Sequence, residues 1–263
     1  MSCRILFSLL ACGLTGCSGP LGGEHVEPPL LVFAAASLQE ALLDIESAFE
    51  AQEGVRVDFS FAGSNVLAQQ IEAAPVADVF FSANVDWMER LSGKGRILPG
   101  SRQDLLSNDL QVIAHKSSDY RMESASDITT LGATYLSIGD PRAVPAGVYA
   151  KAFLEKVSVG EGTAWDVMAS RVAPAPDVRV AMGMVEQRPD VLGIVYRTDA
   201  HSSERVRVLY TVPPEEAPPI RYSVALVQKE KISPDAQSLM TFLGSEAAAA
   251  IFTDHGFVIA GQE

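Results

Sequence analysis

Short apolar strands alternate with amphipathic helices along most of this chain, and that alternation is the feature that most constrains its fold. An apolar run at residues 30–34 precedes a segment, residues 38–49, whose apolar side chains have helical spacing. Residues 55–61 alternate as a half-buried strand does, and residues 79–83 read as a buried strand. Strands that alternate with helices usually pair in parallel and are covered by helices. The sequence therefore predicts an α/β fold with mostly parallel sheets.

The second half of the chain shows the same alternation of strands and helices, without an internal sequence repeat. Further strands are predicted at residues 110–115, 135–139, 192–196 and 221–228. Two sheets of this kind predict two lobes, with a ligand cleft between them at the carboxyl ends of the strands. We expect the strands "LQVIAH" and "RYSVALV" to cross between the lobes. The expected division is residues 30–108 in the first lobe, 109–221 in the second and 222–263 back in the first.

The N-terminal segment is typical of an exported lipoprotein. Arg4 precedes an apolar run, residues 5–14, that is too short to span a bilayer. The run ends in Leu-Thr-Gly-Cys, which resembles the bacterial lipobox, in which the cysteine carries the lipid. We therefore expect a signal peptide at residues 1–16, lipidation of Cys17 and a flexible Gly/Pro-rich tether at residues 17–29. An ordinary signal peptide that is cut nearby is the alternative.

Charge and motif content narrow the function classes. The net charge of −13 disfavours a nucleic-acid-binding protein, because phosphates require a basic face. The sequence has no G-x-S-x-G, G-x-x-x-x-G-K-[ST] or G-x-G-x-x-G motif, and its four histidines lack metal-ligand spacing. We expect no cofactor. An enzyme that uses Ser37 or Ser64 as a nucleophile is the less favoured alternative, since no neighbouring sequence supplies a base.

Two serines lie where a predicted strand ends and a helix begins. Ser37 opens the sequence Ser-Leu-Gln-Glu, which fits a capping box, and simple capping is the interpretation that this pattern favours. Ser64 follows a strand and Gly63, and glycine lets a backbone approach a ligand closely. Helix N-termini present free N–H groups and a partial positive charge. Together these two helix starts can form an anion site that needs no basic side chain.

Longer stretches of the chain resemble the molybdate-binding subunits of bacterial ABC importers, from about residue 30 to residue 259. The stretches that carry the resemblance are "VFAAASL", "GVRVDFSFAGSNVLAQQIEAAPVADVFFSAN", "GDPRAVPAGVYAKAFLEK", "APAPDVRVAMGMVE" and "LGIVYRTDA". The resemblance implies a two-lobed periplasmic-binding-protein fold of type II and no enzymatic activity. It also implies a monomer outside the cytoplasm that binds molybdate, and tungstate as well, and delivers it to a membrane permease.

The resemblance further implies a ligand site that is shared between the lobes. Ser37 and Ser64 would supply hydroxyl groups from the first lobe. Ala146 and Val178 would act through their backbone N–H groups, and Tyr196 through its hydroxyl, from the second lobe. Molybdenum would enter only as the oxyanion. The alternatives are that Ala146 and Val178 are ordinary first-turn residues and that Tyr196 is a buried aromatic with its hydroxyl satisfied elsewhere.

A site made only of hydrogen-bond donors suits molybdate. Molybdate is fully deprotonated at neutral pH, whereas phosphate keeps a proton, and each unmatched buried polar group costs roughly 1–3 kcal/mol. Sulfate would have to be rejected by its smaller size, while tungstate nearly matches molybdate. We expect Arg142 and Arg197 to lie in solvent. An arginine that faced the cleft would widen the preference to other oxyanions, and a receptor for another oxyanion such as sulfate remains the alternative function.

Overall fold

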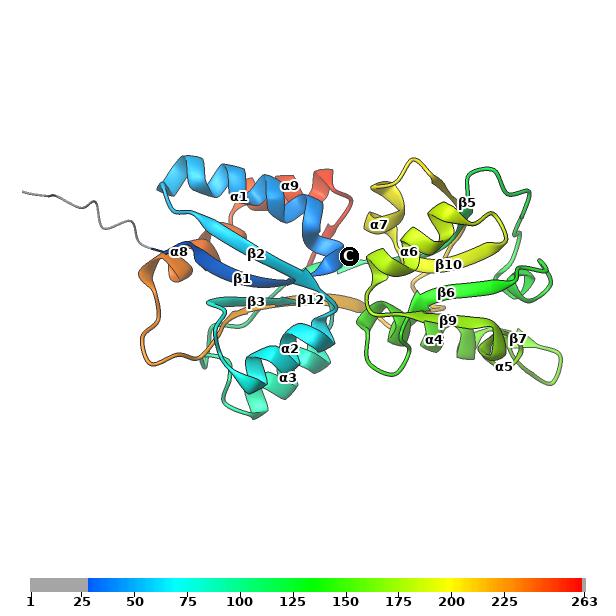
Figure 1. The fold of residues 1–263 in the computed structure, drawn as a ribbon, viewed down its shortest axis with the longest axis horizontal. Helices are drawn as coiled ribbons and strands as arrows, with labels where there is room; N and C mark the ends of the chain where they lie inside the picture. The colour runs from blue at the N-terminus through cyan, green and yellow to red at the C-terminus, as the bar shows by residue number, and fades with distance from the viewer. Residues whose placement is uncertain (1–27, 262–263) are drawn as a thin grey trace, which may run out of the picture.

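The protein, described by a computed structural model for residues 28–261, consists of two α/β lobes side by side (Figure 1). The proposed signal peptide, Cys17 and most of the tether lie outside the described residues. Each lobe is built on one twisted sheet with helices on both faces. The two-lobed fold that the sequence predicts is confirmed.

The first lobe contains a six-stranded sheet in the order β13-β4-β12-β3-β1-β2. Its strands are β1 (Leu30–Ala35), β2 (Val57–Ala62), β3 (Val79–Ser82), β4 (Gln103–Asn108), β12 (Ile220–Leu226) and β13 (Val258–Ile259). Its helices are the 3-10 turn η1 (Ala36–Leu38), α1 (Gln39–Glu53), α2 (Ser64–Ala73), α3 (Val85–Gly93), α8 (Pro234–Leu243) and α9 (Glu246–Asp254). None of the helices within residues 28–261 is both long and apolar enough to cross a membrane.

The second lobe contains a five-stranded sheet in the order β11-β5-β10-β6-β9. Its strands are β5 (Leu110–His115), β6 (Tyr135–Gly139), β9 (Val172–Ala175), β10 (Val191–Tyr196) and β11 (Val206–Thr211), beside the small hairpin β7 (Ser158–Val159) and β8 (Gly162–Thr163). Its helices are η2 (Ala125–Thr129), α4 (Pro145–Lys156), α5 (Ala164–Met168), η3 (Ala169–Arg171), α6 (Val178–Gln187) and α7 (Arg197–His201).

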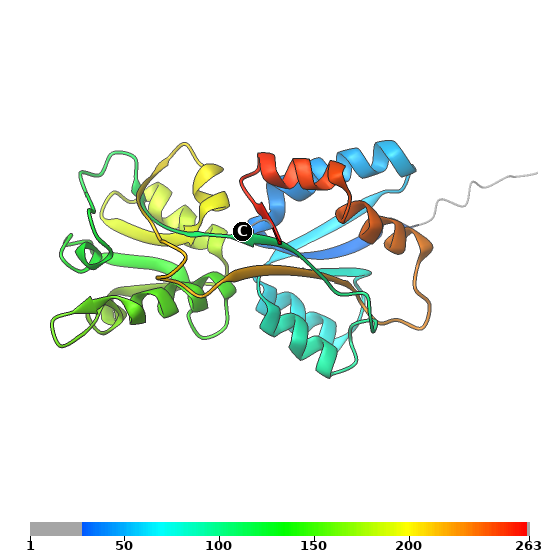
Figure 2. The same cartoon turned by 180° about the vertical axis from the view of Figure 1, so that it is seen from behind.

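The chain crosses between the lobes twice, and the crossings make both sheets mixed rather than mostly parallel. β4 leads into β5, and β11 leads into β12, so that two extended segments run side by side at the back of the molecule (Figure 2). Strands β1, β2 and β3 pair in parallel, whereas β12 pairs antiparallel with both β3 and β4. A strand that returns from the other lobe enters the sheet from the opposite end, which explains the antiparallel pairs. β12 joins the first sheet from Ile220, which pairs with Asn108.

A row of aromatic rings joins the two lobes at the base of the cleft. Tyr196 of β10 lies 5.7 Å, centroid to centroid, from Tyr222 of β12. Phe257 lies 5.4 Å from Tyr222 and 6.0 Å from Phe252. Tyr196 and Tyr222 are both buried. This packing holds the carboxyl end of β10 next to the first lobe, where the candidate site lies.

The lobes are closed on each other in this structure. Trp87 of α3 donates its indole N–H to the carbonyl oxygen of Ala143 in the second lobe, at 3.0 Å. Arg197 of α7 donates to the carbonyl oxygen of Gly256 in the first lobe, at 2.6 Å. These contacts lie on different elements of each lobe, so the cleft between them is narrow.

Candidate functional site

A small cavity lies between the lobes. The first lobe contributes Ala36, Gly63, Ser64 and Ala83 to its wall, and the second contributes Val144, Pro145, Ala146, Asp177, Val178 and Tyr196. Four of the five predicted ligand residues therefore line one cavity, although they are far apart in the sequence. Ser37 is next in the chain to Ala36 but lines a neighbouring cavity with Glu40 and Arg179.

The N-termini of three helices meet at this cavity. Helix α2 begins after Gly63, helix α4 after Val144 and helix α6 after Asp177, and all three of these residues line the cavity. The first N–H groups of a helix have no partner within the helix, and the aligned peptide dipoles place partial positive charge there. The cavity is thus suited to an anion without a basic side chain in its wall.

Pro145 and Asp177 determine which backbone amides of the second lobe are free. Pro145 is the first residue of α4 and has no N–H, so the first amide that α4 can offer is that of Ala146. The Asp177 side chain caps α6 by accepting from the Val180 N–H at 2.9 Å, which leaves the Val178 amide without an intrahelical partner. Ala146 and Val178 are buried, so each amide would be costly to leave unpaired.

Gly147 brings the start of α4 close to strand β6. A Cβ atom at Gly147 would lie 1.9 Å from the carbonyl oxygen of Gly139, which is far inside any real contact. The helix start can approach the strand end only because Gly147 has no side chain. This contact fixes the neighbouring Ala146 amide at the cavity wall.

Ser64 faces the cavity with its hydroxyl proton available. Its Oγ accepts a hydrogen bond from the Ala83 N–H at 3.0 Å, and the side chain is buried. A backbone N–H can only donate, so Oγ must be the acceptor and its proton needs a second partner. Gly63, not Ser64, is the N-cap of α2, and no side chain of the described residues caps that helix. Ser64 is therefore placed as a donor rather than as a helix cap.

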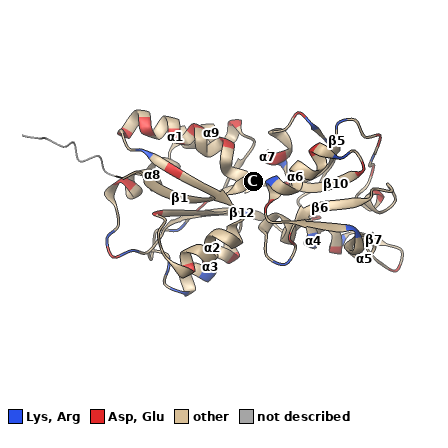
Figure 3. Cartoon of the chain, viewed as in Figure 1, with Lys and Arg blue, Asp and Glu red and all other residues tan. Residues whose placement is uncertain are grey.

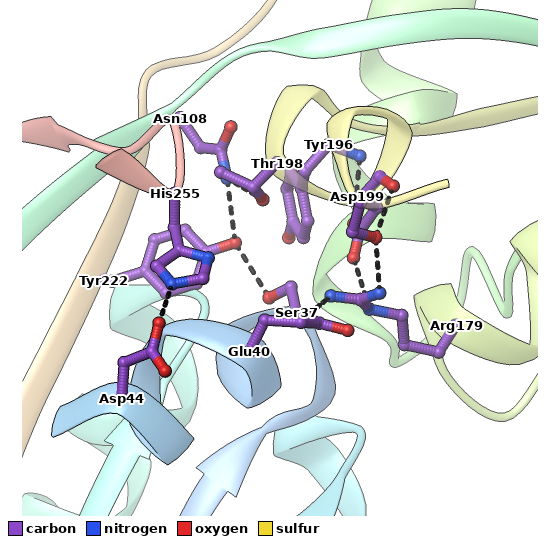
Figure 4. A network of polar contacts seen from close by, with 11 residues as sticks. Ser37, Glu40, Asp44, Asn108, Arg179, Tyr196, Thr198, Asp199, Tyr222 and His255 are labelled. Atoms are coloured by element: carbon purple, nitrogen blue, oxygen red, sulfur yellow. Dashed lines mark hydrogen bonds and ion pairs between the residues drawn. The ribbon is translucent and has the colours of Figure 1, made fainter. Parts of the chain in front are cut away.

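The capping-box interpretation of Ser37 is wrong. Helix α1 begins at Gln39 after the 3-10 turn η1, and neither element has a side-chain cap. The Ser37 hydroxyl instead lies 2.9 Å from the Tyr222 hydroxyl of the crossover strand β12 (Figure 4). A long-range partner replaces the local one because β12 enters the sheet close to η1. Ser37 is buried at the cleft.

Tyr196 has a buried hydroxyl with no hydrogen-bond partner among the described residues. Its side chain lines the cavity and is 1% exposed. Burial raises the pKa of Tyr196 well above its ordinary value, so the phenol keeps its proton and acts as a donor. A buried polar group without a partner costs roughly 1–3 kcal/mol. An anion in the cavity would remove that penalty.

Neither arginine near the predicted site segments lines the cavity. Arg142 pairs with Asp140 at 2.6 Å, and its side chain is 83% exposed, as expected. Arg197, which we expected in solvent, is only partly exposed. Its side chain is 35% exposed because it pairs with Asp109 at 3.1 Å and contacts the Gly256 carbonyl of the other lobe. Figure 3 marks the charged residues along the ribbon, among them several acidic residues of α1.

A charged network next to the cavity was not predicted from the sequence. Arg179, the second residue of α6, pairs with the fully buried Asp199 at 2.8 Å and also contacts Glu40 of the first lobe (Figure 4). Burial raises the pKa of Asp199 to about 7 despite the nearby Arg179 guanidinium. The network joins the lobes beside Ser37. The sequence indicated Glu40 only as the glutamate of a capping box, so no sequence signal pointed to its contact with the other lobe.

The contacts of the two serines give no support to nucleophilic catalysis. Ser37 contacts the Tyr222 hydroxyl, and Ser64 accepts from a backbone amide. Neither partner is a base that could take a proton from the serine at neutral pH. The chemistry that this arrangement offers is the holding of an anion by hydrogen-bond donors.

Comparison with known proteins places this chain in a family. A family model described as bacterial extracellular solute-binding protein matches residues 30–258. The molybdate-binding protein ModA of Escherichia coli (strain K12) is 41% identical over 237 residues, which cover 89% of this chain and 90% of that protein. ModA of Haemophilus influenzae is 37% identical over 230 residues, which cover 86% and 88% of the two chains.

A solved structure shows the same fold at lower identity. The periplasmic molybdate-binding protein of Azotobacter vinelandii superposes with a TM-score of 0.77 and 22% identity, and covers 87% of this chain and 98% of its own. The match to the family model includes both lobes and both crossings. This chain is a member of the bacterial extracellular solute-binding protein family.

Proposed function

We propose that this protein binds molybdate outside the cytoplasm and delivers it to an ABC importer. The observation that carries the proposal is the interlobe cavity, where three helix N-termini converge with the Tyr196 hydroxyl, which has no hydrogen-bond partner within residues 28–261. The relatives that are 41% and 37% identical are named molybdate-binding proteins, which supports the same ligand here. Closure of the lobes around the ion would give the permease a shape by which to recognise the loaded protein.

The donors around the cavity explain how molybdate would be selected. Ser64 and Tyr196 would donate from their hydroxyls, and Ala146 and Val178 from their backbone amides. Ser37, at the edge of the same cleft, would add a fifth donor. Every oxygen of a fully deprotonated ion can accept from such groups, whereas the proton of phosphate would face another donor. We propose tungstate as a second ligand because it has the same charge and nearly the same size.

We further propose that the protein is a monomeric lipoprotein without a cofactor. The Leu-Thr-Gly-Cys sequence supports lipidation at Cys17, and residues 18–29 would then tether the domain to the membrane. Both halves of the candidate site come from one chain, which supports a monomer. Metabolic labelling with palmitate tests the lipid, and loss of label in Cys17→Ser is the expected result.

Thermal unfolding of the domain with four oxyanions tests the proposed ligand. An ion present at about 1,000 times its dissociation constant stabilises the folded state by roughly 4.1 kcal/mol. We expect molybdate and tungstate to raise the unfolding temperature, and sulfate and phosphate to leave it nearly unchanged. Equal shifts with sulfate would indicate a broader oxyanion receptor, and no shift with any ion would refute the ligand assignment.

A further inference from the structure

A buried chain of hydrogen bonds leads from one crossover strand to Ser37. Asn108, the last residue of β4, donates from Nδ2 to the Tyr222 hydroxyl at 3.3 Å and to Thr198 Oγ1 at 3.0 Å. The Tyr222 hydroxyl lies 2.9 Å from Ser37 Oγ. All four side chains are buried, and Figure 4 shows Tyr222 between Asn108 and Ser37.

The direction of these hydrogen bonds follows from one backbone amide. The Asp109 N–H donates to Asn108 Oδ1 at 2.9 Å, and a backbone N–H can only donate. This identifies Oδ1 as the acceptor end of the Asn108 amide. The other end, Nδ2, can therefore only donate to Tyr222 and Thr198.

The direction of donation that is set at Asn108 extends through the Tyr222 hydroxyl to Ser37 at the cleft. Because the Tyr222 oxygen accepts from Asn108, the phenol proton is free to be donated to Ser37 Oγ. Burial raises the pKa of Tyr222, so that proton stays in place at neutral pH. Either hydroxyl of this pair could donate, and the direction in which Tyr222 donates makes Ser37 Oγ the acceptor and leaves the Ser37 proton for a partner in the cleft.

We propose that Asn108 and Tyr222 are positioning residues that hold the Ser37 hydroxyl as a donor and so select oxyanions that carry no proton. The inference rests on the proposed function and deepens it, because it assigns the discrimination against protonated oxyanions to residues outside the cavity wall. Neither residue lines the interlobe cavity. Asn108 ends β4 and Tyr222 lies near the start of β12, so both lie next to the two connections between the lobes.

Loss of the Tyr222 hydroxyl should change selectivity as well as affinity. In Tyr222→Phe the Ser37 hydroxyl loses the group that fixes it and can rotate to accept a proton from a ligand. We expect molybdate to bind about 5- to 100-fold more weakly, as for one lost or misdirected buried hydrogen bond. Phosphate, which has a proton to donate, should lose less affinity or gain some. The ratio of the phosphate to the molybdate dissociation constant should therefore fall about tenfold or more.

The experiment is calorimetric titration with molybdate, and with phosphate by competition against molybdate, at neutral pH. Tyr210→Phe is the matched control, since the Tyr210 hydroxyl contacts Glu216 away from the cleft. Asn108→Leu should shift the ratio in the same direction but less, because Tyr222 then loses only its orienting donor. In a Ser37→Ala background, Tyr222→Phe should leave the ratio unchanged.

The outcomes separate this inference from the proposed function. If the wild-type protein binds molybdate and the ratio does not fall in Tyr222→Phe, the positioning role is wrong and the ligand assignment stands. If the ratio falls equally in the Ser37→Ala background, Tyr222 acts by another route and the inference is also wrong. A wild-type protein that binds neither ion overturns both. Unfolding of each variant without ligand shows whether it is folded, and a misfolded Tyr222→Phe leaves Asn108→Leu as the deciding variant.

Discussion

Gly63 lies where the two lobes approach each other, so a methyl group there should weaken ligand binding without weakening folding. A Cβ atom at Gly63 would lie 2.7 Å from the carbonyl oxygen of Pro176 in the second lobe. It would also lie 2.6 Å from Asn65 Oδ1, the end of a side chain that can rotate away. The backbone oxygen cannot rotate away, so the lobes must separate by several tenths of an ångström. Gly63→Ala therefore opposes the closed state.

The size of the effect follows from the cost of overpacking. Extra atoms in a well-packed region typically cost about 1–3 kcal/mol, which corresponds to roughly 5- to 150-fold weaker binding if the cost falls on the closed state alone. The open state should not suffer. Gly63 has φ −60° and ψ 136°, which alanine adopts without strain. The gain of about 0.4–1 kcal/mol through the unfolded chain opposes the poorer helix N-cap that alanine makes, so the stability of the unliganded fold should change little.

Calorimetry with molybdate and thermal unfolding without ligand measure the two effects separately. Gly183→Ala in helix α6 is the matched control, because a Cβ atom there meets no atom within 4 Å. The control should be stabilised, because it replaces a glycine inside a helix, and should bind normally. Unchanged affinity in Gly63→Ala would refute the reasoning, since it would mean that binding does not require the lobes to close as far as they do here.

Three further predictions concern the cavity wall and its charged neighbour. Gly147→Ala should lower both stability and affinity, because its Cβ atom would lie 1.9 Å from the Gly139 carbonyl oxygen; equal thermal unfolding of variant and wild type would contradict this. Tyr196→Phe should stabilise the unliganded protein, since it removes a buried hydroxyl without a partner, but should weaken molybdate binding about 5- to 100-fold, as calorimetry would show. Burial raises the pKa of Asp199 from 3.8 to about 7. Between about pH 4 and 7 the folded protein therefore holds a proton that the unfolded chain has released, so this group lowers the unfolding free energy as the pH rises. In Asp199→Asn this part of the pH dependence of the unfolding free energy should disappear. Urea unfolding at both ends of the pH range measures it, and an equal pH dependence in variant and wild type would contradict the prediction.

The elements that are continuous in sequence were predictable, and the contacts between crossing strands were not. The buried strands β3 and β10 and the helix start at Pro145 could be identified because their apolar patterns and start signals are local. The mixed sheets were missed because strand direction depends on how the chain returns from the other lobe. β4 and β13 were missed as well, since β4 has a half-polar sequence and β13 is two residues long.

In the candidate site, too, some residues could be identified from the sequence and others could not. The positions of Ser64, Ala146, Val178 and Tyr196 at one cavity agree with the resemblance that named them. Tyr222 was identified only as part of a strand, because its hydroxyl reaches Ser37 across 185 residues of sequence. The local capping pattern at Ser37 was misleading for the same reason. A tertiary partner that competes with a local one cannot be identified from a single sequence.

A crystal structure of the domain with molybdate, recorded at the molybdenum absorption edge, tests the central claim most directly. We expect one anomalous peak in the interlobe cavity, with oxygens within hydrogen-bond distance of the Ala146 and Val178 amides and of the Ser37, Ser64 and Tyr196 hydroxyls. No arginine or lysine side chain should contact the ion. A peak outside this cavity, or an ion held by Arg142 or Arg197, would contradict the claim that hydrogen-bond donors without a basic side chain bind the ligand.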